Sequence, residues 1–245
     1  MCTLGSVNRK YLFKNRDIGT ENSFEEEIVR NKRRYSYVGV AGRTNRQERG
    51  LNSGINEWGV SAAITWVGGP EGLSEDILRK TPRGVIVEDV VGNAKNLLEA
   101  AEIAQWHLVR GAHVGGNIVI ANEEGIVSIE EIDRRFAVEF VEEDFFFRTN
   151  HFLNLTRPVE NDDSPHRFEA IRRLFSEKSA EDVDVPFIRE QLAWRGEDAF
   201  IYKKTEDGLG SATVSAVIYD IPSCVAHYRY VCDPGASWQI LEPPQ

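Results

Sequence analysis

The sequence predicts an α+β fold with two β-sheets and two layers of helices. Residues with β-branched or aromatic side chains are concentrated in the first third of the chain, between 116 and 150, and near the C-terminus. Between these strand-type blocks, the hydrophobic residues recur at the three-and-four spacing of a helix. Strands and helices that come in separate blocks, instead of alternating one by one, are typical of α+β proteins.

The first third of the chain predicts four strands, and a helical region follows them. Polar or glycine-containing turns separate these strands, which cover 3–7, 11–13, 35–41 and 59–67. The block ends at the breaker Gly68-Gly69-Pro70. From 85 to 109 the apolar positions have helical spacing, and Gly92 divides this region into two short helices, the second of which stops at Gly111.

Strand patterns then resume and predict an antiparallel meander with a turn at 122–125. Its strands cover 117–121, 126–132, 136–141 and 145–149. Ser164 and Pro165 open a further helix, as an N-cap residue and a proline in the first helical position, and another helix spans 186–194. The chain closes with two strands, at 212–219 and 225–231.

Length and charge narrow the class of protein. The 245 residues contain no repeat or linker, so we expect a single domain over residues 1–245. A net charge of −10 argues against binding to nucleic acid or to anionic membranes. No stretch approaches the ~18 apolar residues of a membrane helix, and Arg9 and Lys10 interrupt the N-terminus before a signal peptide could form. These features predict a cytoplasmic protein.

The three cysteines do not indicate a disulfide framework or a metal site. Cys2, Cys224 and Cys232 are an odd number and lack Cys-x-x-Cys spacing, and the histidines lack the spacing of metal ligands. We therefore expect no metal and no other cofactor. Cys224 and Cys232 lie in an apolar stretch, where a free cysteine usually behaves as a small buried hydrophobic residue.

Cys2 differs from the other two because removal of Met1 would place a thiol and a free α-amine on one residue. An α-amine has an ordinary pKa of ~7.7–8.0. A useful fraction is therefore unprotonated near neutral pH and can accept the thiol proton without a histidine. The alternative is an accidental cysteine, since reactivity also needs a suitable microenvironment. The residues downstream favour the first interpretation.

Short motifs follow in order along nearly the whole chain. They are Cys2-Thr3, Phe13-Lys14-Asn15-Arg16-Asp17, Gly54-Ile55-Asn56-Glu57-Trp58-Gly59-Val60, Thr149-Asn150-His151-Phe152, the helix start Ser164 to Phe168 and the strand Thr213 to Asp220. Their joint order resembles the choloylglycine hydrolase and isopenicillin N acyltransferase group of N-terminal-nucleophile (Ntn) hydrolases, which includes penicillin V acylase and bile salt hydrolase. The resemblance implies an αββα sandwich, with two antiparallel sheets between helical layers and the N-terminal cysteine at a strand end in a cleft.

The resemblance also implies catalytic roles for three charged residues. Asp17 matches an aspartate that contacts the amine of the nucleophile, with an ordinary turn residue as the alternative. Lys14 stands where the family usually has arginine, and lysine cannot form the planar fork of a guanidinium. Either Lys14 or the neighbouring Arg16 therefore takes that role. Arg167 matches an arginine at the start of the later helix, with an ordinary solvated charge as the alternative.

Four further residues are expected around the reacting carbonyl group. Asn150 matches the family's oxyanion asparagine, whose side-chain amide can stabilise the developing negative charge. A backbone N–H near Thr65 or Trp66 could supply a second donor, although bile salt hydrolases have an asparagine at about the Trp66 position. His151 is expected on the leaving-group side of the substrate site, with a buried, hydrogen-bonded histidine as the alternative.

Together these features predict an enzyme that cleaves a linear, non-peptide C–N amide bond of a small molecule through a thioester on Cys2. Transfer of the acyl group to an amine is a close variant, because both reactions share the thioester. The resemblance further implies a homo-oligomer, either a dimer or a tetramer.

The alternative is a non-catalytic binding or trafficking protein on the same scaffold. Asn15-Arg16-Asp17 is similar to the signature of another Ntn-like family, which has an N-terminal Met-Cys and an Asn-Arg-Asp-Glu motif. Ile18 occupies the fourth position here, and the block from Thr149 to Phe152 fits the hydrolase group better.

Overall fold

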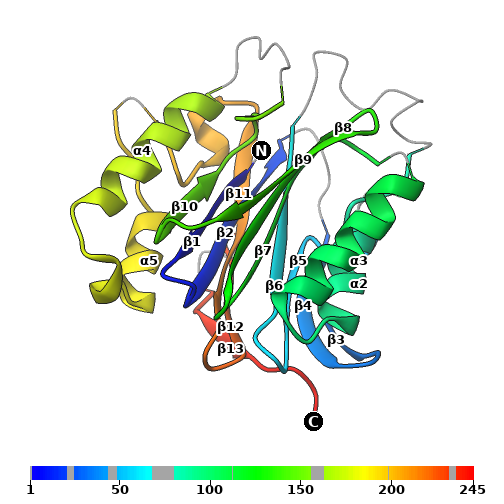
Figure 1. The fold of residues 1–245 in the computed structure, drawn as a ribbon. Coiled ribbons are helices and arrows are strands. Elements are labelled where there is room, and N and C mark those ends of the chain that lie inside the picture. The colour runs from blue at the N-terminus through cyan, green and yellow to red at the C-terminus, as the bar shows by residue number, and fades with distance from the viewer. Residues whose placement is uncertain are drawn as a thin grey trace.

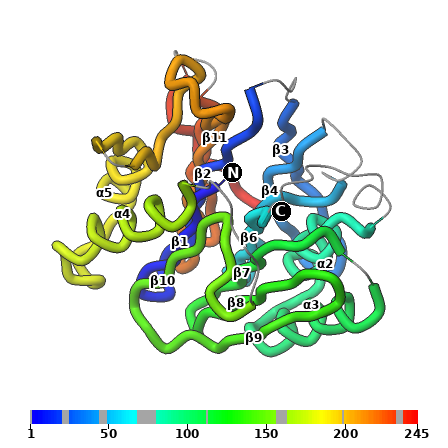
Figure 2. Tube along the Cα trace, turned by 90° about the horizontal axis from the view of Figure 1, so that it is seen from above, coloured from blue at the N-terminus to red at the C-terminus, as the bar shows by residue number. Residues whose placement is uncertain are grey.

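Two antiparallel sheets face each other, and helices cover the outer face of each (Figures 1 and 2). The computed structural model describes residues 2–20, 25–43, 49–67, 80–111, 113–155, 163–197, 199–231 and 236–245. The predicted α+β sandwich, with two sheets between two helical layers, is confirmed.

The first sheet, sheet A, contains the start of the chain. Its order is β10 (Phe145–Arg148), β1 (Cys2–Val7), β2 (Tyr11–Gly19), β11 (Ser211–Asp220), β12 (Val225–Tyr230) and β13 (Gln239–Leu241). In the β1–β2 hairpin, Cys2 lies opposite Arg16 and Leu4 lies opposite Lys14. Side chains that face each other across an antiparallel pair share one side of the sheet. These four side chains therefore lie on the same face, which is turned toward the second sheet.

The second sheet, sheet B, follows the chain order among the described residues. Its strands are β3 (Glu26–Lys32), β4 (Ser36–Gly42), β5 (Ser53–Asn56), β6 (Ser61–Trp66), β7 (Gly116–Asn122), β8 (Gly125–Ile132) and β9 (Arg135–Val141). All neighbouring strands are antiparallel. The helical region predicted after the first strand block forms the connection between β6 and β7.

Helices α2 (Gly84–Asn93) and α3 (Leu97–Arg110) cover sheet B, and α4 (Ser164–Ser176) and α5 (Val185–Leu192) cover sheet A (Figure 1). Two short 3-10 helices lie at Ala180–Asp182 and Thr205–Asp207. The Asn96 side chain caps α3 by accepting a hydrogen bond from the Glu99 N–H, and Gly111 follows its last residue. Asp184 caps α5 in the same way. The predicted division of the 85–109 region into two helices is confirmed.

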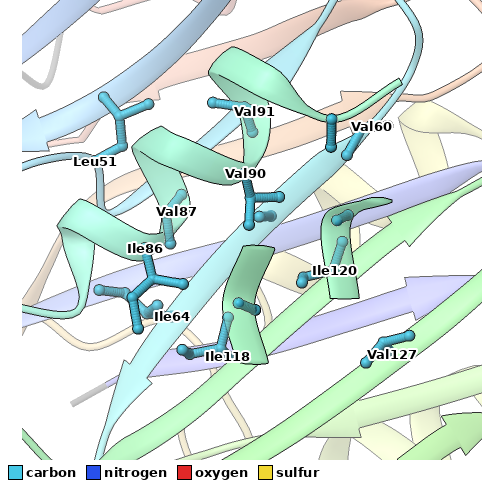
Figure 3. Close-up of a cluster of buried hydrophobic side chains, with 14 of the residues drawn as sticks. Leu51, Val60, Ile64, Ile86, Val87, Val90, Val91, Ile118, Ile120 and Val127 are labelled. Atoms are coloured by element: carbon cyan, nitrogen blue, oxygen red, sulfur yellow. The ribbon is translucent and has the colours of Figure 1, made fainter. Parts of the chain in front are cut away.

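Three layers of buried hydrophobic side chains hold the sandwich together. The outer layer on sheet B packs Val87 and Val90 of α2 against Ile118 and Ile120 of β7 (Figure 3). A second layer lies between the sheets, and a third lies between sheet A and its helices. Strands buried on both faces read as nearly continuous apolar runs. This explains why strands such as β6, β7 and β8 were readily predicted from the sequence.

The structure differs from the sequence prediction mainly at the polar strands. β3, β5 and β13 were not predicted, and β2 continues to Gly19 instead of ending at Phe13. β3 carries charged, partly exposed side chains, and the second half of β2 consists of polar residues that the fold buries. The strand predicted at 145–149 was assigned to the meander of sheet B. In the structure this strand is β10, which belongs to sheet A and pairs with β1.

Cys224 was expected to be buried, but the structure exposes it in part. It lies in the turn between β11 and β12 with a positive φ of 55°, and its thiol contacts the Ile221 carbonyl oxygen. Cys232 lies outside the described residues.

Candidate active site

Cys2 begins β1 and is buried, with 6% of its surface exposed. Its N–H donates a hydrogen bond to Asn150 Oδ1 at 2.5 Å. This contact follows from the topology, because Asn150 comes shortly after β10, and β10 pairs with β1. The departure of β10 from the meander therefore brings Asn150 to the predicted nucleophile.

Lys14 lies on the neighbouring strand, on the same face as Cys2, and is fully buried. Its ammonium group donates to two neutral acceptors, Asn52 Oδ1 directly before β5 and the Ile64 carbonyl oxygen of β6. Burial lowers the pKa of Lys14 to about 8, although the nearby Cys2 raises it. Burial raises the pKa of the Cys2 thiol, but the Lys14 charge and other neighbouring groups lower it, and the net pKa is below its ordinary value.

Arg16, the alternative to Lys14, forms an ion pair with a residue of the other sheet. Its guanidinium forms a buried ion pair with Glu26 of β3, at 2.9 Å. Glu26 also accepts hydrogen bonds from Ser215 and Tyr228 of sheet A. Arg16 therefore connects the two sheets, whereas the charge of Lys14 lowers the pKa of the Cys2 thiol.

Arg167 is fully buried at the start of α4, so it is not the solvated helix charge considered above. Its Nη1 donates to the Cys2 carbonyl oxygen at 2.8 Å, and its Nη2 donates to Asn150 Oδ1 at 3.0 Å. A guanidinium can only donate, so this contact fixes which atom of the Asn150 amide is the oxygen. The Asn150 Nδ2 consequently points the other way and donates to the Trp66 carbonyl oxygen at 2.5 Å.

Asp163 forms ion pairs with Arg167 and with a second buried cation. One carboxylate oxygen accepts from Arg167 Nε at 3.1 Å, and the other pairs with the fully buried Lys203 at 2.5 Å. Burial raises the pKa of Asp163, but these two cations lower it by more, so its net pKa is below the ordinary value. Neither Asp163 nor Lys203 was predicted, because no local sequence pattern relates either residue to the site.

Side chains from sheet B hold the backbone around Asn150. The Thr65 hydroxyl donates to the Thr149 carbonyl oxygen at 2.7 Å. The Asn117 side-chain amide donates to the carbonyl oxygens on both sides of Asn150, those of Thr149 at 2.9 Å and His151 at 3.3 Å. Asn150 is therefore fixed by its own backbone as well as by Arg167.

Glu130 of β8 anchors the next residues of the same segment. Its buried carboxylate accepts three backbone hydrogen bonds, from the N–H groups of Leu153, Asn154 and Leu155, at 2.7 to 2.8 Å. Asn117 and Glu130 lie directly opposite each other on β7 and β8. The sequence offered one signal for this pair, namely polar residues inside strands that are otherwise apolar.

His151 faces hydroxyl groups. Its Nδ1 lies 2.9 Å from both Thr149 Oγ1 and Ser164 Oγ, and its ring packs nearly perpendicular to that of Phe168. Burial, together with nearby Arg148 and Arg167, lowers its pKa. Ser164, predicted as the N-cap of α4, is instead the first helical residue, and its hydroxyl accepts from the Asn150 N–H at 2.6 Å.

The two residues expected to supply a second oxyanion donor contact the site through oxygen atoms. The Thr65 carbonyl oxygen accepts from Arg83, and the Trp66 carbonyl oxygen accepts from Asn150. Arg83 was not predicted. It is buried near Cys2, and burial lowers its pKa to about 10, while Glu131 and Cys2 raise it.

Asp17 lies at the far end of the β2 motif. Its carboxylate accepts from the Thr213 hydroxyl at 2.8 Å. The charge of this carboxylate raises the pKa of the Cys2 thiol, and a hydrogen bond from the Asp17 backbone N–H lowers it. Within the described ranges, no group of histidine, cysteine, aspartate or glutamate side chains has a metal-binding arrangement.

Two sheets between helices, with a buried cysteine at the start of the first strand, define the class of Ntn hydrolases. The model of the acyl-coenzyme A:6-aminopenicillanic acid acyl-transferase family matches residues 5–235. The chain belongs to this family. A comparison with curated protein sequences gives no match.

Solved structures of Ntn hydrolases share the fold at low sequence identity. The C2A mutant of conjugated bile acid hydrolase from Clostridium perfringens has a TM-score of 0.63 at 14% identity, over 98% of this chain and 92% of that one. Penicillin V acylase from Agrobacterium tumefaciens has a TM-score of 0.61 at 12% identity, over 97% and 85%. The Caenorhabditis elegans N-acylethanolamine-hydrolyzing acid amidase ortholog has a TM-score of 0.59 at 14% identity, over 89% and 92%.

Proposed function

We propose that the chain is an N-terminal cysteine amidohydrolase that cleaves the C–N bond of a linear amide through a thioester on Cys2. The observation that carries this proposal is the buried Cys2 thiol beside the buried Lys14 ammonium, whose charge lowers the pKa of the thiol. A low pKa increases the thiolate fraction, and the thiolate is the nucleophile.

The mechanism begins once Met1 is removed and the Cys2 N–H has become an α-amine. The amine takes the thiol proton, and Cys2 Sγ attacks the carbonyl carbon to form a C–S bond and an oxyanion. Nδ2 of Asn150 has two N–H groups. One is directed at Trp66, and the other would donate to the oxyanion.

Collapse of the oxyanion breaks the C–N bond. The leaving amine takes the proton from the α-ammonium, which Asp17 would hold in place. Water then attacks the thioester as the α-amine takes one of its protons, the C–S bond breaks, that proton passes to Cys2 Sγ, and a carboxylic acid leaves. An amine in place of water would give acyl transfer, the reaction in the family's name.

The similar proteins support a small-molecule amide as the substrate class. The names of the structural neighbours describe conjugated bile acids, penicillin V and N-acylethanolamines, all of which are small-molecule amides. A panel of these amides and of N-acyl amino acids is therefore the appropriate screen. His151 would line the leaving-group side of the site, next to Phe168.

A mass measurement of the intact chain tests the proposal. We expect loss of Met1, labelling of Cys2 by one equivalent of iodoacetamide and, with an amide substrate, a mass increase equal to the acyl group. Cys2→Ala should abolish turnover and the acyl adduct without unfolding, whereas Cys224→Ala, which removes a cysteine from a turn, should retain both. A chain that keeps Met1 and forms no adduct with any amide of the panel would instead be the binding protein on the same scaffold.

A further inference from the structure

Lys203 has a fully buried side chain, although lysine is almost never fully buried in a folded protein unless it is paired. Its backbone is fixed to β11, because its N–H donates to the Thr213 hydroxyl at 3.0 Å and its carbonyl oxygen accepts from the Thr213 N–H at 2.9 Å. Its ammonium group pairs with Asp163 Oδ2, directly before α4, at 2.5 Å. The chain therefore holds a buried cation between β11 and the start of α4.

The carboxylate that Lys203 holds is shared with Arg167, and every nitrogen of the Arg167 guanidinium has an acceptor. Its Nε donates to Asp163 Oδ1 at 3.1 Å, its Nη1 to the Cys2 carbonyl oxygen at 2.8 Å, and its Nη2 to Asn150 Oδ1 at 3.0 Å. An unbroken series of polar contacts thus runs from the Lys203 ammonium to the predicted nucleophile and to the candidate oxyanion donor.

Asp163 can steady Arg167 only if its own carboxylate is fixed. The Asp163 side chain is 32% exposed, so water competes for it, whereas the Lys203 side chain has no exposed surface. The buried ammonium therefore ties the partly exposed carboxylate to the interior of the protein. Without this tie, the Arg167 guanidinium would turn more easily about its Cδ–Nε bond, and Nη1 and Nη2 would leave their acceptors together.

The backbone of Lys203 leads to the other side of the nucleophile. The Thr213 hydroxyl, which accepts from the Lys203 N–H, donates its own proton to Asp17 Oδ1 at 2.8 Å. In the proposed mechanism Asp17 holds the α-ammonium of Cys2. A substitution of the Lys203 side chain leaves this backbone connection in place, so it tests the connection through Asp163 alone.

We propose that Lys203 is a positioning residue for Asn150. Its ammonium fixes Asp163, Asp163 fixes the Arg167 guanidinium, and the guanidinium holds Asn150 Oδ1 so that Nδ2 is available to the oxyanion. A guanidinium can only donate, so a firmly held Arg167 keeps the Asn150 amide from turning over. The effect on turnover rests on the proposed function, whereas the positioning of the amide does not.

Steady-state kinetics of Lys203→Met tests the effect on turnover. We expect kcat to fall by roughly tenfold or more, as part of the cost of a lost oxyanion donor, with KM nearly unchanged. The alkylation profile of Cys2 should stay the same, because Lys14, not Lys203, lowers the pKa of its thiol. Lys203→Arg should lose less, since it keeps a cation. Lys204→Met is the matched control, because it removes the next lysine, whose side chain is 47% exposed, and should keep kcat. A Lys203→Met variant with the kcat of this control would overturn the proposal.

A double variant separates positioning from an independent structural role. Asp163→Asn breaks the same series of contacts one step later, so Lys203→Met combined with Asp163→Asn should have about the kcat of the slower single variant. Losses in kcat that multiply would show that the two residues act independently and would overturn the proposal. Urea unfolding establishes that each variant is folded, and Lys203→Gln gives the same comparison if Lys203→Met is not.

Crystal structures of the wild-type chain and of Lys203→Met provide a readout that needs no substrate. In the variant, we expect the distance from Arg167 Nη2 to Asn150 Oδ1 to exceed the ~3.2 Å of an ordinary hydrogen bond. An unchanged contact would overturn the proposal even if the amidase activity is established. A wild-type chain that turns over no amide would instead contradict the proposed function, and the two crystal structures would still decide whether Lys203 positions Asn150.

Discussion

In the proposed mechanism, the reactivity of Cys2 depends most directly on Lys14. Its ammonium is buried beside the thiol, and its two hydrogen-bond acceptors are neutral. A buried charge without an anionic partner is costly. The thiolate of Cys2 is therefore the natural counter-ion, and the two groups stabilise each other's charged form.

The Lys14→Met variant tests this pairing. We expect the pKa of the Cys2 thiol to rise above its ordinary value, because the variant removes the main group that opposes the effect of burial. Alkylation of Cys2 at pH 7 should slow by roughly tenfold or more, since each pKa unit changes the thiolate fraction tenfold. Rates measured with iodoacetamide from pH 6 to 10 give this pKa. Lys14→Arg should keep the low pKa, and an unchanged profile in Lys14→Met would remove Lys14 from the site.

The same substitution should change how stability depends on pH. The pKa of Lys14 falls from 10.5 to about 8 on folding, so between these values the unfolded chain binds more protons than the folded chain. The free energy of unfolding that Lys14 contributes therefore increases with pH through this window. Urea unfolding at pH 8 and pH 10 should show that this increase is lost in Lys14→Met.

Asn150 is the candidate oxyanion donor, and Arg167 sets the orientation of its amide. Asn150→Ala should lower kcat by roughly 10²–10³ with a much smaller effect on KM, as expected for a donor used in the transition state. Steady-state kinetics with the best amide of the panel measures both constants. A raised KM with unchanged kcat would instead make Asn150 a substrate-binding residue.

At the scale of elements, the segment from Thr149 to Leu155 depends on side chains of sheet B. Glu130→Gln replaces one carboxylate oxygen by an NH₂ group, which donates and cannot accept. The three backbone N–H groups therefore have only one oxygen left as an acceptor. We expect a loss of ~1–3 kcal/mol in the free energy of unfolding. Cleavage by protease near 153–155 should become faster in native conditions. Glu142→Gln, a change on the loop after β9, is the control, and equal behaviour of the two variants would contradict the anchoring role of Glu130.

The elements also show which part of the fold can be read from the sequence. Apolar strands such as β7 and the pair α2–α3 were predicted because one hydrophobic pattern specifies each of them. The polar half of β2 was missed because Lys14, Arg16 and Asp17 resemble surface residues, although the fold buries them. Lys14, Asn150 and Arg167 were assigned to the site only through the resemblance to a family, whereas the position of Cys2 directly after Met1 singled it out before that resemblance. Asp163, Arg83 and Lys203 carry no local pattern, because only tertiary contacts bring them to the site.

At the scale of the whole molecule, the candidate site draws on both sheets but not on the outer core of sheet B. Ile118 lies in that outer core, between β7 and α2. Ile118→Ala should lower the free energy of unfolding by ~2–5 kcal/mol. The alkylation rate of Cys2 in the folded protein should stay unchanged. Leu4→Ala, in the layer between the sheets next to Cys2, should affect both quantities.

Among the described residues, no helix is long and apolar enough to span a membrane. The cytoplasmic location, the single domain and the homo-oligomeric state inferred from the sequence stay predictions.

The pairing of β1 with β10 joins two strands that the ribosome synthesises at different times. Cys2 and Asn150 are separated by 148 residues, and a ribosome adds residues at roughly 5–20 per second. For on the order of ten seconds, β1 is therefore outside the ribosome while the strand that covers it has not been made. An aminopeptidase can reach the bond before Cys2 in this interval, and after it the Cys2 nitrogen is held by Asn150. In the proposed mechanism, Met1 would thus be removed before β10 pairs with β1 and brings Asn150 to the Cys2 nitrogen.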